Sequence, residues 1–469
     1  MVVSPEDFEK LELDLSCFEL EINGVPIWER VRFGVYRELR QKTGAGQAHT
    51  RNEEGIRTYF NGVMQWGKNW IYKNPFLSGE HQYMFVGHPR RKLEDDGYWW
   101  DVYCDPIHDE TDLDYIHFET PHLMSHHTPA KTEHLRYLDA ITYTGTIQRK
   151  LGLRTPSIDT DANNHIAEIE SEIVDRFGVR ADVEEKIRTK LHVRNTTLGL
   201  YKRLLDRVNP DVVILVVSYG KETFIEACKQ KEIPVVELQH GVIYDHHFGY
   251  SFPDGIQKET FPDYLLTFGA FWNENARFPL PDDRLIPVGY PYLNQSVDQY
   301  DDVTKHDQLL FISQGTIGEQ LSKFAMEVST HSNLECDIVY KLHPGEYDRW
   351  RDEYPWLLGA DFKIVDSSDR QLYALFAEST AQIGVSSTAV YEGLAFGLET
   401  FVYDCHGSSV LQPLVDDGSA SKVASVDQLV SLLGSGKVSF NHNYYFELES
   451  VERICRVIKH ISDMKTTYD

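Results

Sequence analysis

The feature that most constrains the fold is a regular alternation of short apolar runs and helical stretches from Asp211 onward. Asp211 to Val217 (DVVILVV) reads as the clearest strand, followed by a helix over Lys221 to Gln230 and a strand over Pro234 to Leu238. Two further strands are predicted at Tyr264 to Phe268 and at Leu285 to Val288. Strands that alternate with helices predict a parallel, doubly wound α/β sheet.

The same alternation starts again after a polar linker, Gln295 to Asp307. The second round comprises predicted strands over 309–312, 337–341, 362–365, 381–383 and 400–403, and predicted helices over 317–330, 370–377, 388–396 and 426–433. Two consecutive Rossmann-like units predict two domains that face each other across a cleft, with ligands at the C-terminal ends of the strands.

The predicted organisation has four parts. They are an N-terminal helical extension over 1–80, a first Rossmann-like domain over 81–295, a second over 306–445, and a C-terminal helix over 446–469. In the extension, Ile27 to Arg40 has apolar residues three and four positions apart, as a helix requires. A Gly/Thr/Asn-rich break is predicted near residues 43–55, and Gln82 to Val86 reads as a buried strand that ends at Gly87-His88-Pro89. No motif in residues 1–80 indicates a function.

Composition narrows the range of partners and locations. With 73 acidic and 46 basic residues the net charge is −27, which repels nucleic acid and anionic lipid headgroups. The longest apolar stretch, Val212 to Val217, is far shorter than the roughly 20 residues that span a bilayer. The acidic N-terminus has no signal segment. We therefore expect a cytoplasmic protein without a nucleic-acid partner, at most peripheral at the inner face of a membrane.

Three motifs in the second unit favour binding of a phosphate. The first is Ser313-Gln314-Gly315-Thr316, a small turn between a predicted strand and helix, where backbone N–H groups can approach an anion. The alternative is an ordinary strand-to-helix turn. The second is Lys341-Leu342-His343-Pro344, at the end of a strand. Strand alternation would point Lys341 and His343 the same way, and a cation beside an imidazole suits a phosphate.

The third motif is Ser386-Ser387-Thr388, which precedes a predicted helix. Three hydroxyl groups at a helix start offer side-chain donors together with unpaired backbone N–H groups, whereas helix capping alone accounts for only one of them. Glu392 lies one turn into that helix and is predicted to accept hydrogen bonds from ribose hydroxyls. The alternative for Glu392 is a solvated helix carboxylate.

Together these motifs resemble the donor-binding half of bacterial and archaeal GT-B glycosyltransferases of surface-polysaccharide assembly. The resemblance is to sialyltransferases, Kdo-type transferases and CDP-glycerol glycerophosphotransferases, which share a Lys-x-His-Pro and a Ser-Ser/Thr signature, and it covers roughly residues 210–435. It implies a GT-B fold in which His343, Ser386 and Ser387 hold the donor phosphate and Glu392 the ribose.

Two places compete for the catalytic base. Gln239-His240-Gly241 ends a predicted strand, and the resemblance to the CDP-glycerol group implies that His240 takes the proton of the acceptor hydroxyl, a task that suits an imidazole. The alternative for His240 is a structural histidine at a tight turn. The run Glu94-Asp95-Asp96-Gly97 resembles the acidic motif of bacterial sialyltransferases, which makes Asp95 and Asp96 rival bases, or else part of a solvated loop. Asp105 is a weaker candidate.

Other patterns carry less weight. Ser218-Tyr219-Gly220-Lys221 ends the strand DVVILVV, so Ser218, Tyr219 and Lys221 are predicted at the edge of the cleft. Asp112-Leu113-Asp114 matches a metal-binding DxD, but two-lobed transferases generally need no metal. The six cysteines form no CxxC pair, and the adjacent histidines at 126–127 and 246–247 complete no zinc site. No metal and no cofactor is expected.

The resemblance implies an inverting transfer of a sugar from a nucleotide-activated donor, of CMP or CDP type, to a glycan or lipid-linked acceptor. Such an enzyme would serve surface-polysaccharide or glycoprotein glycan synthesis. The sequence leaves three alternatives open: a CDP-polyol phosphotransferase, a nucleotide-sugar 2-epimerase, and a non-catalytic nucleotide-binding protein.

Overall fold

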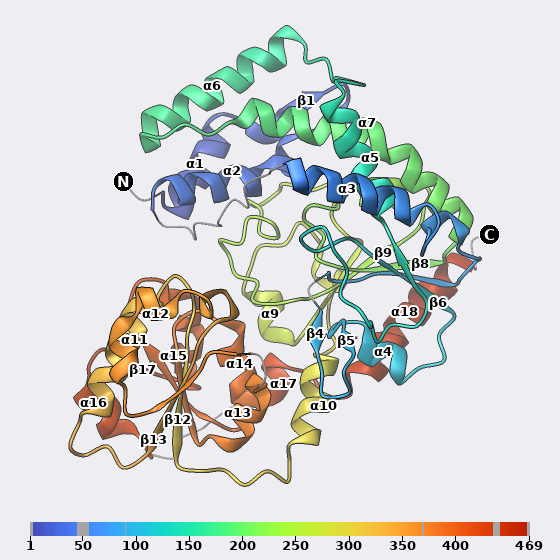
Figure 1. Cartoon of the computed structure of the whole chain (residues 1–469). Coiled ribbons are helices and arrows are strands. Elements are labelled where there is room, and N and C mark those ends of the chain that lie inside the picture. The colour runs from blue at the N-terminus through green and yellow to red at the C-terminus, as the bar shows by residue number, and fades with distance from the viewer. Residues whose placement is uncertain (1–2, 45–55, 90, 368–369, 435–440, 467–469) are drawn as a thin grey trace. The chain divides into compact units, whose positions relative to one another are not determined.

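The computed structural model describes residues 3–44, 56–89, 91–367, 370–434 and 441–466. The chain forms two compact units, shown in Figure 1. Unit 1 comprises Met1–Pro291 together with Glu449–Asp469, and unit 2 comprises Tyr292–Leu448. Each unit is built on a parallel sheet with Rossmann-like connections. The α/β class predicted from the sequence is therefore confirmed.

Unit 1 contains a seven-stranded sheet in which every paired strand is parallel to its neighbour. In spatial order the strands are β11 (Leu285–Pro287), β10 (Tyr264–Thr267), β9 (Val235–Leu238), β8 (Val212–Val216), β3 (Tyr83–Val86), β6 (Tyr115–Glu119) and β7 (Leu135–Tyr137). The chain starts at β3, builds outward to β7, and then returns to β8 on the other side of β3. The connections therefore diverge between β3 and β8, as in a Rossmann fold.

Helices cover both faces of this sheet. Those of unit 1 are α1 (Pro5–Asp14), α2 (Trp28–Lys42), α3 (Ile56–Asn69), α4 (Asp105–Asp109), α5 (Asp139–Lys150), α6 (Thr160–Phe177), α7 (Val183–Val208), α8 (Glu222–Lys229), α9 (Ala270–Glu274) and α18 (Ser450–Thr466). Strand β8 is buried throughout because α18 packs against Ile214 and its neighbours on one face, while α7 and α8 pack against Val213 and Leu215 on the other. Burial on both faces explains the uninterrupted apolar sequence of this strand.

Two short antiparallel hairpins complete unit 1. They are β1 (Glu21–Ile22) with β2 (Val25–Pro26), and β4 (Lys92–Leu93) with β5 (Trp99–Trp100).

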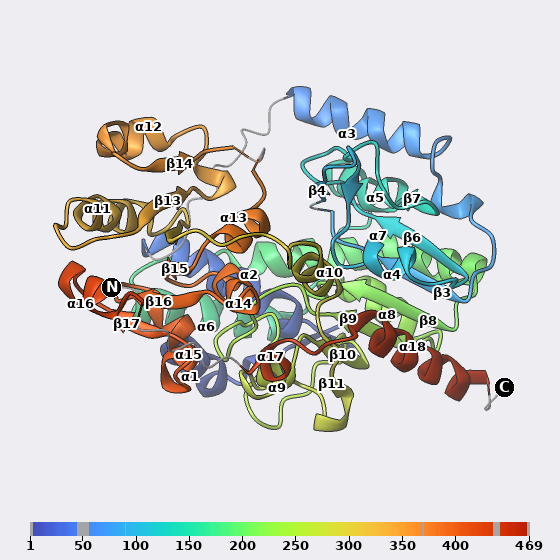
Figure 2. The same cartoon turned by 90° about the horizontal axis from the view of Figure 1, so that it is seen from below.

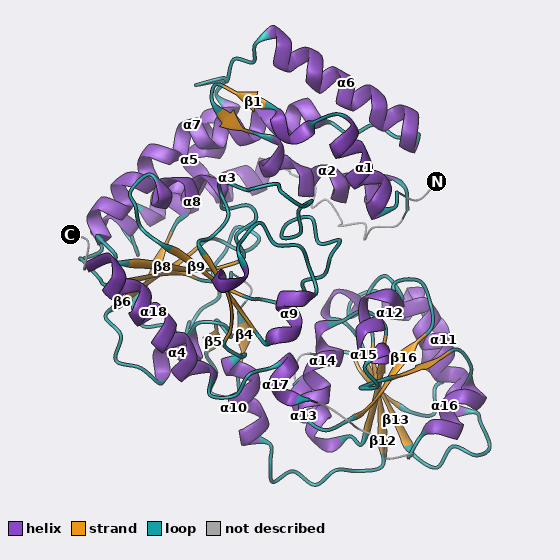
Figure 3. Cartoon of the chain, turned by 180° about the vertical axis from the view of Figure 1, so that it is seen from behind, coloured by secondary structure: helices purple, strands orange, loops and turns teal. Residues whose placement is uncertain are grey.

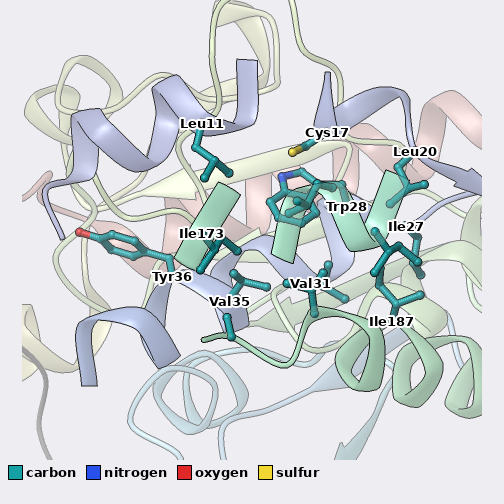
Figure 4. Packing of buried hydrophobic residues seen from close by; sticks show 14 of the residues in the cluster. Leu11, Cys17, Leu20, Ile27, Trp28, Val31, Val35, Tyr36, Ile173 and Ile187 are labelled. Atoms are coloured by element: carbon teal, nitrogen blue, oxygen red, sulfur yellow. The ribbon is translucent and has the colours of Figure 1, made fainter. Parts of the chain in front are cut away.

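The N-terminal helices form a hydrophobic cluster of their own. Side chains of α1 and α2, including Leu11, Trp28 and Val31, pack against Ile173 of α6 and Ile187 of α7 (Figure 4). The segment predicted as an extension over 1–80 thus shares a core with helices more than a hundred residues further along the chain.

A buried ion pair lies in this cluster. Arg32 donates from Nε and from Nη2 to the two carboxylate oxygens of Glu12, each over 2.7 Å, and both side chains are fully buried. Arg32 also donates to the backbone carbonyls of Phe248 (3.3 Å) and Ser251 (2.6 Å), and its guanidinium lies 4.5 Å from the ring centroid of Phe252. The N-terminal helices are therefore fastened to the segment 248–252.

Unit 2 contains a six-stranded parallel sheet with helices on both faces (Figure 3). In spatial order its strands are β14 (Lys363–Val365), β13 (Asp337–Lys341), β12 (Gln308–Ile312), β15 (Ala381–Gly384), β16 (Glu399–Tyr403) and β17 (Ser421–Val423). Its helices are α11 (Gly318–Ser329), α12 (Trp350–Glu353), α13 (Leu372–Glu378), α14 (Thr388–Ala395), α15 (Gln412–Asp416), α16 (Val426–Leu432) and α17 (His442–Tyr445).

Several elements differ from the sequence prediction. Part of the predicted linker over 295–307 is helical, because α10 (Pro291–Gln299) buries Leu293 and Ser296 one turn apart. The C-terminal helix is not a separate segment, since α18 covers the unit 1 sheet (Figure 2). The prediction missed β6 and β7, which are short and contain charged or imidazole side chains. The break predicted near 43–55 falls mostly outside the described residues. None of the described helices is both long and apolar enough to cross a bilayer.

Loss of the buried ion pair should destabilise unit 1. Arg32→Met would leave the Glu12 carboxylate buried without its cation, which costs about 3–5 kcal/mol. Denaturant unfolding followed by fluorescence measures this cost. Arg456→Met, which removes an exposed pair with Glu452, should cost no more than about 1 kcal/mol. Equal effects of the two substitutions would contradict the prediction.

Candidate functional site

The strand order of unit 2 places two of the predicted motifs side by side. In order of sequence its strands run 3-2-1-4-5-6, and the connections diverge between β12 and β15. In such sheets, ligands bind beyond the carboxyl ends of the strands at this point. The turns that follow β12 and β15 are 313–317 and 385–387, which hold Gln314 and Ser386.

Hydrogen bonds join these two turns directly. The Oε1 atom of Gln314 accepts from the backbone N–H of Ser386 (3.1 Å) and from its hydroxyl (2.8 Å). Because a backbone N–H can only donate, the Gln314 amide is fixed with its NH₂ group directed away from Ser386. The hydroxyl of Ser387 caps α14 by accepting from the N–H of Ala389 (3.2 Å). The arrangement thus presents amide donors beside a helix N-terminus.

The remaining predicted residues of these turns lie beside the Gln314–Ser386 contact in the sequence. Gly315 and Thr316 lie between Gln314 and the start of α11, and Thr388 is the first residue of α14. A Cβ atom added to Gly407, after β16, would lie 4.0 Å from the Ser386 hydroxyl, so a third turn approaches the same point.

His343 begins a 3-10 turn, Pro344–Glu346, in which it acts as the capping residue. Its Nδ1 accepts from the N–H of Gly345 (3.1 Å), and Glu346 accepts from the N–H of His343 (2.8 Å). A lone pair on Nδ1 requires that the neutral ring carries its proton on Nε2. Glu346 is fully buried and also accepts from the Ser313 hydroxyl (3.2 Å), so it ties this turn to the one after β12. The exposed imidazole therefore offers an Nε2–H donor.

Lys341 and His343 have different surroundings. The ammonium of Lys341 donates to the Tyr347 hydroxyl (2.6 Å) and to the Ser367 carbonyl (2.7 Å), and the residue is buried, whereas His343 is exposed. The backbone stays extended past Lys341, since the N–H of Leu342 donates to the Val365 carbonyl (3.1 Å) and His343 has a φ of −68° and a ψ of 143°. Lys341 thus holds the segment after β14, and its role toward a phosphate stays a prediction.

Arg349 supplies a cation that the sequence analysis missed. Its Nε donates to the Gly345 carbonyl (2.9 Å) and its Nη2 to the Gly315 carbonyl (3.5 Å), so the guanidinium lies between the turns after β12 and β13. It also forms an ion pair with Glu353, which raises its pKa. The only sequence signal was a basic residue six positions after His343. Glu392, in α14, accepts from the Tyr373 hydroxyl (2.8 Å), so its carboxylate is already oriented.

In unit 1, three turns also meet where the connections diverge. They follow β3 (Gly87-His88), β8 (Ser218 to Lys221) and β9 (Gln239-His240). The Tyr219 hydroxyl lies 3.4 Å from Nε2 of His240, and the rings of His88 and His240 are stacked with centroids 6.3 Å apart. Gly87 must be glycine, because a Cβ there would lie 2.1 Å from the Asp101 carboxylate.

A chain of hydrogen bonds orients His240. The Tyr250 hydroxyl lies 2.5 Å from Oε1 of Glu237 and 3.2 Å from Nδ1 of His240. Tyr250 has one hydrogen and donates it to Glu237, so its oxygen accepts from Nδ1–H of His240. The lone pair of the neutral imidazole is therefore on Nε2, on the side of Tyr219. Burial raises the pKa of Glu237, whose Oε1 also accepts from the backbone N–H of Ser218 (3.0 Å). A base oriented by two further groups is typical of catalytic sites.

The turn after β8 is strained and held from several sides. Val217 has a φ of 67°, a left-handed conformation that is unusual for a β-branched residue. The ammonium of Lys221 donates to the carbonyls of Val216 (2.8 Å) and Val217 (2.7 Å), and the N–H of Ser218 donates to Glu237 (3.0 Å). Burial lowers the pKa of Lys221 to about 8. Of the three residues predicted at a cleft edge, Tyr219 contacts His240, while Ser218 and Lys221 fix the backbone.

The acidic candidates have structural partners. Asp96 accepts from the N–H of Tyr98 (2.9 Å) and from the indole of Trp100 (3.0 Å), which closes the β4–β5 hairpin. Asp95 is exposed at the tip of the same hairpin. Asp105 is buried and bound to Arg91 and Thr132, and burial raises its pKa to about 7. In the described part of the chain, the hydrogen-bond and ion-pair partners of the Asp96 and Asp105 carboxylates are Tyr98, Trp100, Arg91, Thr132 and the N–H of Asp101, and His240 is not among them.

One group of described residues has metal-ligand chemistry: Asp101, Cys104 and His117, with ligand atoms within 4.8 Å of one another. Asp101 already accepts from the N–H groups of His88 (2.8 Å) and Tyr103 (3.1 Å). Burial raises the pKa of the Cys104 thiol and lowers that of His117, which favours the neutral forms of both. The trio therefore supports the turn after β3.

A separate groove of about 710 Å³ lies at the amino-terminal ends of β9–β11, opposite the turns described above. Its lining includes Lys229 and Arg284.

The structure predicts an acid-sensitive contribution from His247, whose ring stacks on Phe33 with centroids 5.3 Å apart. Burial lowers the pKa of His247 to about 4, so between pH 6.5 and 4 the unfolded chain binds a proton that the folded chain excludes. Protonation of His247 in the unfolded chain should therefore lower the free energy of unfolding by about 2–3 kcal/mol as the pH falls from 7 to 4.5. His247→Phe should lack that loss when urea unfolding is compared at both pH values. The same pH dependence of unfolding in the wild type and in His247→Phe would refute this prediction.

No protein-family model and no curated protein matches the chain. Among solved structures it is similar to UDP-GlcNAc 2-epimerase from Methanocaldococcus jannaschii, at 13% identity and a TM-score of 0.48 over 81% of this chain and 99% of that one. It is also similar to the wall teichoic acid polymerase TagF, in a variant soaked with CDPG, at 9% identity and a TM-score of 0.47 over 88% and 97%. At these values the similarity assigns no activity to the chain.

Proposed function

We propose that the chain is a GT-B-type glycosyltransferase that uses a nucleotide-activated sugar. The observation that carries this proposal is the pair of turns joined by Gln314 and Ser386 at the point where the connections of unit 2 diverge. In a Rossmann-like sheet this point binds the phosphates of nucleotides. The donors arranged there suit an anion that carries charge on several oxygens.

The phosphate of the donor would be held by neutral and cationic donors together. The amide of Gln314, Nε2–H of His343 and the first turn of α14 supply N–H groups, and Arg349 supplies positive charge. When the sugar leaves, negative charge grows on the phosphate, and fixed donors stabilise it without reorganisation. A positive site of this kind is needed in a chain of net charge −27, whose average field opposes an anionic substrate. Glu392 would bind the ribose.

His240 would be the base that takes the proton of the acceptor hydroxyl. Its Nε2 lone pair is set by Tyr250 and Glu237, as a third group orients the histidine in a catalytic triad. Tyr219 lies beside the same nitrogen and could be displaced by the acceptor. The geometry favours His240 over Asp95 and Asp96, because Asp96 closes the β4–β5 hairpin and Asp95 is exposed at its tip. The CMP or CDP type of the donor and inversion rest on the sequence resemblance alone.

The reaction class is tested by product mass. The protein is incubated with CMP-, CDP- and UDP-activated donors and glycan or lipid-linked acceptors, and the masses of the products are measured by mass spectrometry. Addition of a sugar to the acceptor supports glycosyl transfer. Addition of a phosphopolyol shows a phosphotransferase, conversion of UDP-GlcNAc without an acceptor shows a 2-epimerase, and binding without turnover shows a non-catalytic protein. Each of the last three outcomes would replace the proposal.

His343→Ala should weaken binding of CMP, CDP or UDP by about tenfold to a hundredfold, since a hydrogen bond to a charged group contributes about 1.5–3 kcal/mol. Calorimetric titration measures the dissociation constant. His331→Ala, at a partly buried histidine of unit 2 paired with Asp427, is the control and should leave the dissociation constant unchanged. Equal affinity of both variants would remove His343 from the phosphate site.

His240→Ala should lower kcat by about 10² to 10⁴, the usual contribution of a general base, and leave nucleotide affinity unchanged. Tyr250→Phe removes the acceptor of Nδ1–H and should lower kcat less, with a shifted pH profile. Tyr264→Phe, under Arg284 at the start of β10, is the control. A fully active His240→Ala enzyme would return the role of base to an acidic residue.

A further inference from the structure

Helix α3 has an inner face that packs on α5 and an outer face that is unexpectedly apolar. On the inner face, the indole of Trp66 donates to the Thr144 hydroxyl (3.0 Å), and the Asn69 side chain accepts from the N–H of Ala140 (2.8 Å). Figure 2 shows α3 lying along α5 at the margin of unit 1. Since the inner face is already satisfied, the outer face would be polar in an ordinary surface helix.

The outer face instead exposes large apolar side chains. Val63 and Met64 are each about half exposed, and just beyond the helix Ile71 is 86% exposed and Leu77 66%. Val63 and Met64 lie in α3, which ends at Asn69, and the exposed Trp70, Ile71 and Tyr72 follow directly after it. Exposed apolar side chains concentrated within residues 63–77 mark an interaction surface. We define the α3 surface as Val63, Met64, Lys68, residues 70–73 and Leu77.

The charge of this segment differs from that of the rest of the chain. Residues 62–79 include no Asp or Glu, but they include Lys68 and Lys73. With 73 acidic residues in 469, about three would be expected in a stretch of this length. At physiological salt, charges interact over only about 8 Å, so the distant carboxylates do not cancel this local positive charge.

The cations are located beside the aromatic rings. The ammonium of Lys68 lies 5.4 Å from the ring centroid of Tyr72, and that of Lys73 lies 5.9 Å from it. From α7, the guanidinium of Arg203 lies 6.0 Å from the ring centroid of Phe76. Lys68 is exposed, whereas Lys73 is partly buried and its ammonium also lies 3.5 Å from the Tyr137 hydroxyl. A basic side chain beside a Tyr ring matches the polar boundary of a bilayer, where apolar groups insert and ammonium groups stay with the headgroups.

We propose that the α3 surface docks the protein on a lipid bilayer that carries anionic headgroups. The bilayer fits the surface better than a protein partner does, because the surface combines an apolar stripe with cations and lacks carboxylates. The helix lies in the interface and does not cross it, since the described helices include none suited to spanning. This inference is independent of the proposed function, because vesicle binding needs no substrate.

The test is co-sedimentation of the full chain with vesicles of phosphatidylcholine, with or without about 30% phosphatidylglycerol. The wild type should sediment with the anionic vesicles at about 0.15 M salt and be released at about 1 M. Ile71→Ser with Leu77→Ser, and separately Lys68→Glu with Lys73→Glu, should each lower the bound fraction at least tenfold. Leu358→Ser, which removes an apolar side chain that is 64% exposed in unit 2, should bind like the wild type.

Two results would overturn the proposal. One is a wild type that does not sediment with anionic vesicles, or serine variants that bind these vesicles as well as the wild type does. The other is a wild-type dimer in light scattering that the serine variants dissociate, which would make the α3 surface an interface between copies of the chain. Thermal stabilisation by CDP, measured on every variant, separates these outcomes from a failure of folding or of the proposed nucleotide site.

Discussion

The buried pair of Arg32 and Glu12 is the interaction on which unit 1 depends. Through it the N-terminal helices hold the backbone at Phe248 and Ser251, on either side of Tyr250. Tyr250 in turn orients His240 through its hydroxyl. A segment without any recognisable motif is thus connected to the candidate catalytic base by a short series of buried polar contacts. Because these contacts are buried, a charged group that loses its partner there is not solvated by water, and the free energy of unfolding falls. Small displacements of the partners are therefore unfavourable.

Much of the fold was predictable because it follows from the periodicity of apolar residues and from the turn-forming residues between them. The buried strand at Val212 to Val216 and the turn at Gln314 to Thr316 are visible in the sequence, since apolar runs and small turn residues report local structure directly. The meeting of Gln314 with Ser386 was not visible. It depends on the strand order, which brings residues 72 positions apart to one edge of the sheet.

What the sequence did not indicate has the same origin. No pattern in the sequence showed that Lys341 would be bonded to Tyr347 and Ser367, or that His343 would cap a turn tied to Ser313 through Glu346. Arg349 and Tyr250 carry no motif, and their roles arise only from the tertiary contacts that surround them. The role of residues 1–44 was unpredictable for a further reason: their partners, such as Ile173 and Ile187, lie in helices far along the chain.

The chain path has a consequence for biosynthesis. Unit 2 is inserted between residues 291 and 449 of unit 1, so α18 leaves the ribosome after everything else in the described fold. Until then, the face of the sheet around Ile214 and Val236 has no helix to cover it, although its strands are already made. The nascent polypeptide must therefore keep this uncovered face from aggregating throughout the synthesis of some 160 residues, and chaperones that shield apolar surfaces would act during that interval.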